Sequence, residues 1–166
     1  MARSDLSEFT GDSHFRWVIP DPAHEADEIA SHDLIKRVIM CTGQVYTALV
    51  RHRAEIKDRH TAITRIEQLN PFPWALLKEN LDSYPNAETL VWAQEEPLNA
   101  GAWSFTQPRI ETLLNETKYH NRRHVMYAGR STSASVATGL KSVHQKEEKD
   151  MLEMAWSVRQ DKLKGE

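Results

Sequence analysis

The amino-acid sequence predicts an α/β fold, a three-layer sandwich in which helices cover both faces of a mostly parallel β-sheet. Short runs of apolar and β-branched residues, typical of buried strands, alternate with segments of about 10–15 residues whose apolar positions recur at helical spacing. Strands joined in this way form right-handed crossovers. Neighbouring strands then run parallel, and the helices between them pack on the sheet.

The predicted strands are short. Phe15, Trp17 and Ile19 alternate with their neighbours in a segment that Pro20 ends, which predicts a strand at the edge of the sheet. Four buried strands are predicted further along, at residues 37–41, 61–67, 89–93 and 125–128.

The predicted helices lie between these strands. Residues 44–56 carry apolar side chains at helical spacing, and Pro73 suits the first position of the next helix. A third helix is predicted at residues 100–115, where Pro108 should kink or divide it. A fourth is predicted at residues 133–143, and a last one follows the charged stretch 145–150.

The length of 166 residues suits one domain, which buries roughly 70% of its unfolded surface. We divide the chain into an N-terminal arm, edge strand and acidic loop (residues 1–34), an α/β domain (35–158) and a polar tail (159–166). A net charge of −3 argues against nucleic-acid partners, and the apolar runs are too short for a membrane span. Cys41, the single cysteine, lies in an apolar run that predicts a buried, unreactive thiol.

Ligands of open α/β sheets bind beyond the carboxyl ends of the strands. Here those ends are predicted at residues 42–44, 67–68, 94–96 and 129–130. No dinucleotide fingerprint, phosphate-binding loop or nucleophile elbow occurs in the sequence, so no catalytic or cofactor-binding residue is predicted. The H-x-x-x-H spacing of His120 and His124 encloses two arginines and has no evident third ligand, so no metal site is predicted.

Glu95 and Glu96 are open to two interpretations. They are a candidate carboxylate pair for acid/base chemistry, but adjacent residues at a strand end point in different directions. In the other interpretation they precede the helix near Asn99 and stabilise its positive end, or lie in an interface.

A candidate anion site follows the last predicted strand. Arg130 adds a permanent cation beside the predicted helix start at Ser133, where backbone N–H groups are free. Arg65 and Gln68 are predicted at the same edge of the sheet. The alternative is that Ser133 only caps the helix and that Arg65 pairs with Glu67 or Glu95.

Five longer strings extend beyond these patterns. They are RIEQLNPFPW (65–74), QEEPLNAGAW (94–103), YAGR (127–130), SASVATG (133–139) and SVHQKE (142–147). In order and spacing they resemble the C-terminal, transketolase-like domain of the 2-oxoglutarate dehydrogenase family, and residues 2–11 are similar to the linker into it. The resemblance covers residues 2–158 and implies the fold of a transketolase C-terminal domain.

The resemblance implies a parent enzyme that decarboxylates 2-oxoglutarate with thiamine diphosphate and magnesium in the citric acid cycle. It implies a homodimer in the mitochondrial matrix, whose partners are a lipoyl-bearing succinyltransferase core and dihydrolipoyl dehydrogenase. The thiamine-binding motifs have no counterpart here, so the chain is expected to be the end of a longer protein and inactive alone.

The leading hypothesis is therefore a structural domain that completes the dimer of the parent. One alternative is a free-standing module that binds a nucleotide-like anion near Arg65, Gln68 and Arg130, and another is a small enzyme that uses Glu95 and Glu96. Residues 97–105 and the region around Trp156 are expected to expose apolar surface and to self-associate. Gly101 is expected to have an unusual φ or a close backbone neighbour.

Overall fold

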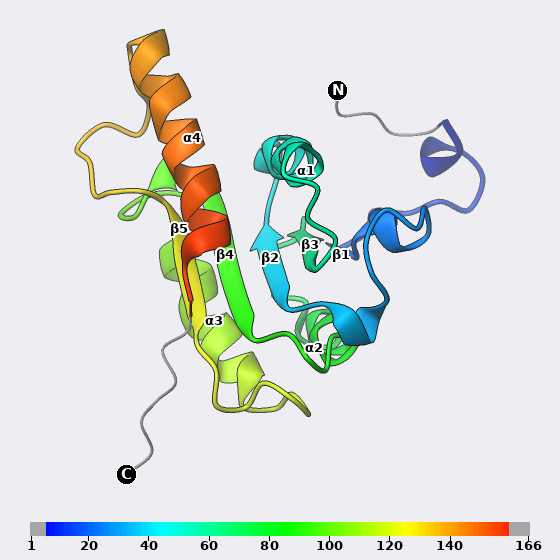
Figure 1. The fold of residues 1–166 in the computed structure, drawn as a ribbon. Helices are drawn as coiled ribbons and strands as arrows, with labels where there is room; N and C mark the ends of the chain where they lie inside the picture. Colours follow the sequence, from blue (N-terminus) through cyan, green and yellow to red (C-terminus); the bar gives the residue numbers. More distant parts are fainter. Residues whose placement is uncertain (1–5, 160–166) are drawn as a thin grey trace.

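The computed structural model describes residues 6–159 and has five strands and four α-helices in that range (Figure 1). The strands are β1 (Val18–Ile19), β2 (Arg37–Cys41), β3 (Thr61–Ile66), β4 (Thr89–Pro97) and β5 (Val125–Arg130). The helices are α1 (Val45–Glu55), α2 (Trp74–Asp82), α3 (Trp103–Leu114) and α4 (Lys141–Ser157). Three 3-10 helices precede β2: η1 (Leu6–Phe9), η2 (Pro22–His24) and η3 (His32–Leu34).

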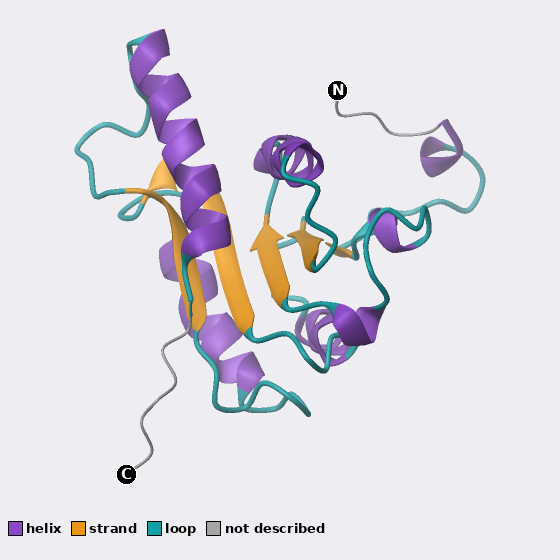
Figure 2. Cartoon of the chain, in the orientation of Figure 1, coloured by secondary structure: helices purple, strands orange, loops and turns teal. Residues whose placement is uncertain are grey.

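The sheet has the strand order β1-β3-β2-β4-β5, in which only the edge strand β1 is antiparallel to its neighbour. Helices lie on both sides of the strands, α1 and α4 on one face and α2 and α3 on the other (Figure 2). The predicted α/β sandwich with a mostly parallel sheet is therefore confirmed.

Alternation along the buried strands supplies the two halves of the core. In β2, Val38 and Met40 belong to the core under α2 and α3, whereas Ile39 and Cys41 belong to the core under α1 and α4. This is the period-2 pattern of a sheet that is covered on both faces. Cys41 is fully buried, and burial raises the pKa of its thiol, so the prediction of a buried, unreactive cysteine is confirmed.

The N-terminal segment contributes to the same core. Val18, Ala23 and Ile29 are buried in the core under α2 and α3. The predicted edge strand is present but has only two residues, and the alternating aromatic side chains Phe15 and Trp17 remain exposed.

One predicted helix is largely absent, and two other predicted elements are present with different bounds. Residues 131–140 form no helix, because they are rich in Ser, Thr and Gly, which are weak helix formers, and their apolar side chains cover nothing. Val136 and Leu140 are 69% and 67% exposed. Strand β4 runs four residues past its predicted end, because Pro97 pairs again with Arg130 of β5. Helix α3 begins at Trp103, and Pro108 lies inside it without dividing it.

Candidate functional site

Gln94 organises the polar structure at the carboxyl end of β4. Its side chain is buried, and its amide oxygen accepts hydrogen bonds from Trp92 Nε1 (3.0 Å) and from the backbone N–H of Trp103 (2.9 Å). Its amide nitrogen lies 2.9–3.2 Å from three carbonyl oxygens, those of Glu96, Pro97 and Ala100. Because this one side chain joins the end of β4 to the first residue of α3, the turn between them is rigid. Sequence reasoning placed Gln94 at a strand end but missed this role.

Gly101 lies in that turn, just before α3. Its φ is +63°, and a Cβ added there would lie 2.9 Å from both Gln94 Nε2 and Glu96 Cβ. The expectation of an unusual φ and a close neighbour is confirmed. A side chain at this position would be strained by the backbone and would also collide with Gln94, which its hydrogen bonds hold in place.

Glu95 and Glu96 both belong to β4 and point to opposite faces of the sheet. Glu95 accepts a hydrogen bond from Gln44 Nε2 (3.3 Å) at the start of α1, whereas Glu96 packs against the turn at Gly101. Successive strand residues alternate in this way, so the two carboxylates do not form a pair. As predicted, both residues precede a helix, but α3 begins at Trp103, further along the chain than expected.

A hollow of about 470 Å³ opens beside Glu96, at the carboxyl ends of β2 and β4. Its lining includes Leu69, Asn70 and Phe105, and Glu96 is its one charged side chain. This is the edge at which α/β sheets bind their ligands. With a mostly apolar wall and one carboxylate, it is better suited to an uncharged or cationic surface than to an anion.

Arg65 and Gln68 are held by local contacts. The Arg65 guanidinium lies 4.5 Å from the centroid of the Tyr46 ring, and its Nε lies 3.7 Å from Glu67 Oε1. The predicted pairing of Arg65 with Glu67 is confirmed. Gln68 Nε2 donates to the Pro71 carbonyl at 3.3 Å. Both side chains therefore have partners within the chain.

Arg130 is the last residue of β5, and its charge is balanced within the chain. Its Nε lies 2.9 Å from Glu147 Oε2 of α4, and its Nη1 donates to the Val136 carbonyl (3.1 Å). The pKa of Glu147 is lowered, first by a hydrogen bond from Thr138 and further by Arg130. Arg130 therefore fastens the loop 131–140 to α4.

Ser133 begins no helix, so the predicted helix start beside Arg130 is wrong. Instead, the backbone N–H of Ser133 donates to Asn99 Oδ1 (3.1 Å), and Asn99 Nδ2 donates to the Ser133 carbonyl (3.0 Å). The Asn99 side chain thus bonds to both backbone groups of Ser133, as a residue of a paired strand does. Asn99 and Ser133 are thus brought together. The other five predicted site residues are held in separate contacts, and the seven do not converge on one ligand position.

The two candidate metal ligands have different partners. His120 is fully buried and its Nε2 lies 3.0 Å from the Leu81 carbonyl, whereas His124 Nδ1 lies 2.9 Å from Glu111 Oε2. Within residues 6–159, no group of three or more His, Cys, Asp or Glu side chains is placed to hold a metal ion.

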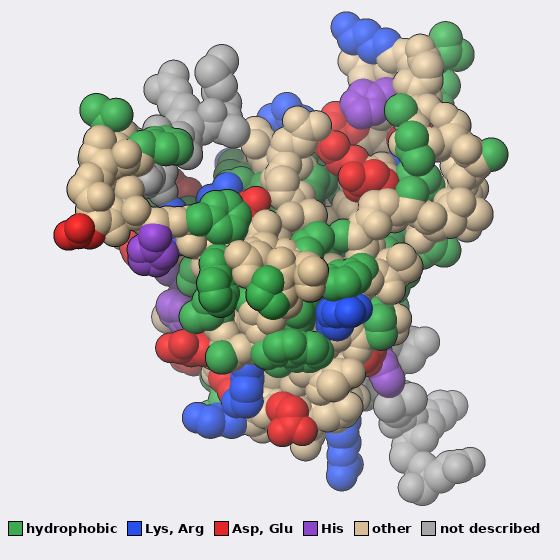
Figure 3. Space-filling model, turned by 180° about the vertical axis from the view of Figure 1, so that it is seen from behind, with side chains coloured by type: hydrophobic (Ala, Val, Ile, Leu, Met, Phe, Trp, Pro, Cys, Tyr) green, Lys and Arg blue, Asp and Glu red, His purple; other side chains and the backbone are tan. Residues whose placement is uncertain are grey.

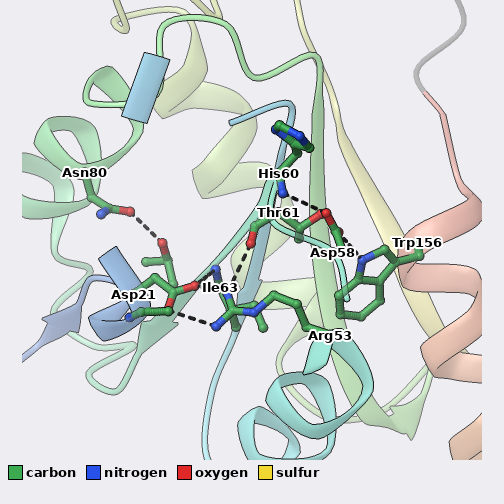
Figure 4. Close-up of polar contacts among 10 residues, drawn as sticks. Asp21, Arg53, Asp58, His60, Thr61, Ile63, Asn80 and Trp156 are labelled. Carbon is green, nitrogen blue, oxygen red and sulfur yellow. Dashed lines mark hydrogen bonds and ion pairs between the residues drawn. The ribbon is translucent and has the colours of Figure 1, made fainter. Parts of the chain in front are cut away.

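A buried ion pair is the polar feature that sequence reasoning missed (Figure 4). Asp21 and Arg53 are almost completely buried, and the Asp21 carboxylate also accepts the backbone N–H groups of Ala23 (3.0 Å) and Ile63 (2.7 Å). Arg53 Nη1 donates in addition to the Thr61 carbonyl at 3.1 Å. One signal was present in the sequence: Arg53 follows Leu49 by four residues and so lies on the buried side of the helix.

Apolar side chains remain on the surface, and Figure 3 shows them gathered across the face that carries α2 and α3. Trp74, Leu76 and Leu98 are 43%, 44% and 38% exposed. The predicted segment 97–105 thus exposes Leu98, whereas its Trp103 is half-buried against Tyr127. Trp156 is also half-buried and donates to Asp58 (2.7 Å), so it contributes less free surface than expected.

Comparisons with known proteins agree on one family. Residues 3–156 match the model of a family described as 2-oxoglutarate dehydrogenase C-terminal. The mitochondrial 2-oxoglutarate dehydrogenase of Saccharomyces cerevisiae is 49% identical over 148 residues, which are 89% of this chain and 14% of that protein. The Caenorhabditis elegans enzyme is 42% identical over 166 residues, 99% of this chain and 15% of that one.

A bacterial relative agrees with these two. The 2-oxoglutarate dehydrogenase E1 component of Cupriavidus necator is 43% identical over 163 residues, 98% of this chain and 15% of that protein. The chain therefore spans about 15% of the length of these curated relatives. A solved structure described as an inactive beta4 tetramer of a split gene transketolase is 16% identical, with a TM-score of 0.49, and covers 72% of this chain and 37% of that one.

Proposed function

Because this chain belongs to the 2-oxoglutarate dehydrogenase C-terminal family, we propose that it is the structural and dimer-assembly domain of a longer 2-oxoglutarate dehydrogenase. The parent would be the succinyl-transferring enzyme, which decarboxylates 2-oxoglutarate and passes the succinyl group to a lipoyl arm. Yeast and nematode relatives are named as mitochondrial, which supports a mitochondrial parent. We place that parent in the matrix.

The parent's cofactors do not fit the described residues. Thiamine diphosphate is held through a divalent cation, usually magnesium, which needs carboxylate and carbonyl oxygens that converge on one point. Among residues 6–159 no such group of acidic side chains converges, and Glu95 and Glu96 point apart. We therefore assign thiamine diphosphate and magnesium to other parts of the parent and derive no chemical step from this chain.

The observation that supports an assembly role is the pairing of a rigid turn with uncovered apolar surface. The hydrogen bonds of Gln94 and the close approach of Gly101 constrain the shape of the edge beside the hollow. Trp74, Leu76 and Leu98 leave large apolar side chains exposed on the molecule. Surfaces of this kind are typical of protein–protein interfaces. The partners that we propose are the remaining domains of the parent and its second subunit, and through them the succinyltransferase core and dihydrolipoyl dehydrogenase.

The alternative, a free-standing anion-binding module around Arg65, Gln68 and Arg130, is less well supported. The charges of Arg65 and Arg130 are opposed by Glu67 and Glu147, which lowers the positive potential at this edge. The anion-binding module stays a prediction.

A complementation experiment tests the proposal. The yeast relative, shortened by the segment that this chain matches, would be mixed with this chain, and both sedimentation and 2-oxoglutarate-dependent reduction of an artificial acceptor would be measured. We expect the shortened enzyme to bind the chain and to regain activity, and the chain alone to give none with added thiamine diphosphate and magnesium. Turnover by the chain alone at the level of the intact enzyme would refute the proposal.

A further inference from the structure

A second cavity lies at the opposite edge of the sheet, where the parallel strands begin. Its volume is about 760 Å³, and it is lined by the first residues of β2, β3 and β4 and by the end of α4. Four cations line it: Lys36, Arg37, Arg123 and Arg159. The sequence prediction of an anion site concerned the carboxyl ends of the strands, so this edge was not considered.

Two cations of this cavity bind backbone carbonyls instead of carboxylates. Arg37 Nη1 donates to the carbonyls of Ala155 (3.1 Å) and Val158 (2.9 Å), and Arg123 Nη1 donates to the Glu88 carbonyl (2.6 Å). A carbonyl oxygen fixes a guanidinium group without neutralising it. By contrast, the arginines in the contacts described above, such as Arg53 and Arg130, are paired with carboxylates.

Carboxylates compensate the four cations only in part. In the described part of the chain, no carboxylate lies within 4.0 Å of the charged nitrogens of Lys36, Arg37, Arg123 or Arg159. Burial lowers the pKa of Arg37. The nearby charge of Asp58 opposes this shift, and the charge of Arg159 lowers the pKa further by a smaller amount. A bound anion would relieve the repulsion between these two guanidinium groups.

The two acidic residues of the cavity are Asp58 and Glu88. Asp58 is engaged in structure, because its carboxylate accepts hydrogen bonds from Trp156 Nε1 (2.7 Å) and from the backbone N–H of His60 (2.7 Å) (Figure 4). Glu88 is exposed and offers its backbone carbonyl to Arg123. Four cations therefore face two carboxylates, which leaves the cavity with an excess of positive charge.

We propose that this cavity is a binding site for a small phosphorylated metabolite that carries at least two phosphate charges. Its volume lies within the range of about 300–1,000 Å³ found for small-molecule sites and exceeds what a single phosphate fills. Guanidinium groups match the geometry of phosphate oxygens, and the carbonyls that hold Arg37 and Arg123 fix both groups before a ligand arrives. Lys36, which is exposed at the same cavity, adds a mobile charge.

Calorimetric titration of the chain with pyrophosphate tests the site. Inorganic phosphate, citrate and sodium chloride at matched ionic strength would serve as the other ligands. We expect saturable binding of pyrophosphate, weaker binding of phosphate, and no saturation with chloride. Both Arg123→Gln and Lys36→Gln should weaken pyrophosphate binding about tenfold, because each removes one charge-assisted hydrogen bond.

Two substitutions of cations outside the cavity serve as matched controls. Arg122→Gln removes the same charge one residue away from Arg123, outside the lining of this cavity, and Lys141→Gln does so at the start of α4. Both should leave the affinity within about twofold, because exposed distant charges are screened. The proposal is overturned if pyrophosphate does not saturate the chain, if Arg122→Gln weakens binding as much as Arg123→Gln, or if citrate binds as tightly as pyrophosphate.

Discussion

Asp21 and Arg53 form a buried ion pair that closes the free edge of β3. Strand β1 pairs with β3 only opposite Ile66 and Arg65. Beyond Pro20, the Asp21 carboxylate accepts the N–H of Ile63 and Arg53 donates to the Thr61 carbonyl, so two side chains continue the pattern of bonds that a longer strand would make. Backbone groups at this edge of β3 thus have hydrogen-bond partners, so they are not open to pairing with a strand of another molecule.

Removal of either charge should destabilise the fold strongly. We expect Asp21→Asn and Arg53→Met each to lower the free energy of unfolding by about 3–5 kcal/mol, because each leaves one buried charge without its partner. Urea unfolding followed by tryptophan fluorescence measures this. Arg59→Met is the control: Arg59 pairs with Asp27 at an exposed site, and its loss should cost less than about 1 kcal/mol. Equal losses at the two sites would contradict our interpretation of the buried pair.

Substitutions at two glycines distinguish the cost of backbone strain from the cost of a steric clash. Gly43 and Gly101 both have positive φ, but only at Gly101 would a Cβ meet other atoms within 4 Å. Gly43→Ala should therefore cost about 1–2 kcal/mol, the penalty for a left-handed residue with a side chain. Gly101→Ala should cost at least about 1 kcal/mol more, because Gln94 cannot move without loss of its hydrogen bonds. Thermal unfolding would compare them, and equal shifts in melting temperature would refute the role of Gln94.

Stability should fall as the pH falls below about 6.5. Burial lowers the pKa of His24, with a further contribution from the stacked His32, and burial lowers that of His120. Each imidazole is thus protonated more readily in the unfolded chain. The stabilisation is complete above the unfolded value of 6.5 and is lost as the pH falls from there towards the lowered folded values.

The measurement for this prediction is the urea midpoint between pH 7.5 and 5.5, a window above the usual pKa values of the carboxyl groups. The variants His24→Gln and His120→Gln should each show a smaller fall in the midpoint than the parent sequence. An unchanged fall in the double variant would show that other groups cause it.

The apolar surface near the end of β4 should make the isolated chain associate. We expect the sedimentation coefficient to rise with concentration, and Leu98→Glu to reduce that rise, because a charge opposes burial of the patch. Leu34→Glu makes the same change at a more exposed leucine in η3, outside the predicted interface. A monomer at every concentration, or equal effects of both substitutions, would count against this surface.

The strands of the sheet were predicted well because strands that are buried on both faces have a simple sequence pattern. Strands such as 37–41 are runs of apolar residues between turn formers, and β2 has those bounds in the structure. The same method was wrong for residues 133–140. Val136 and Leu140 have helical spacing but are exposed outside any helix, whereas Val143 belongs to α4. Periodicity shows which residues would share a face of a helix, but it does not show whether another layer is there to cover that face.

The candidate site was predicted less well, for a related reason. Arg65, Glu95 and Arg130 were identified correctly as charged residues near strand ends, and the pairing of Arg65 with Glu67 was among the stated alternatives. The partner of Arg130, Glu147, is distant in the sequence, and so are Asp21 and Arg53 from each other. Whether an arginine can attract a ligand depends on such long-range partners, which composition and spacing do not reveal.

The Asp21–Arg53 pair also bears on where this fold can be cut. A chain that started at residue 35 would keep every parallel strand, yet it would lose Val18, Ala23 and Ile29 from the core and leave Arg53 buried without its partner. The open edge of β3 would then offer unpaired backbone groups to any extended segment nearby. Residues 18–29 thus protect the edge of the sheet, and a chain without them would be prone to strand-mediated aggregation.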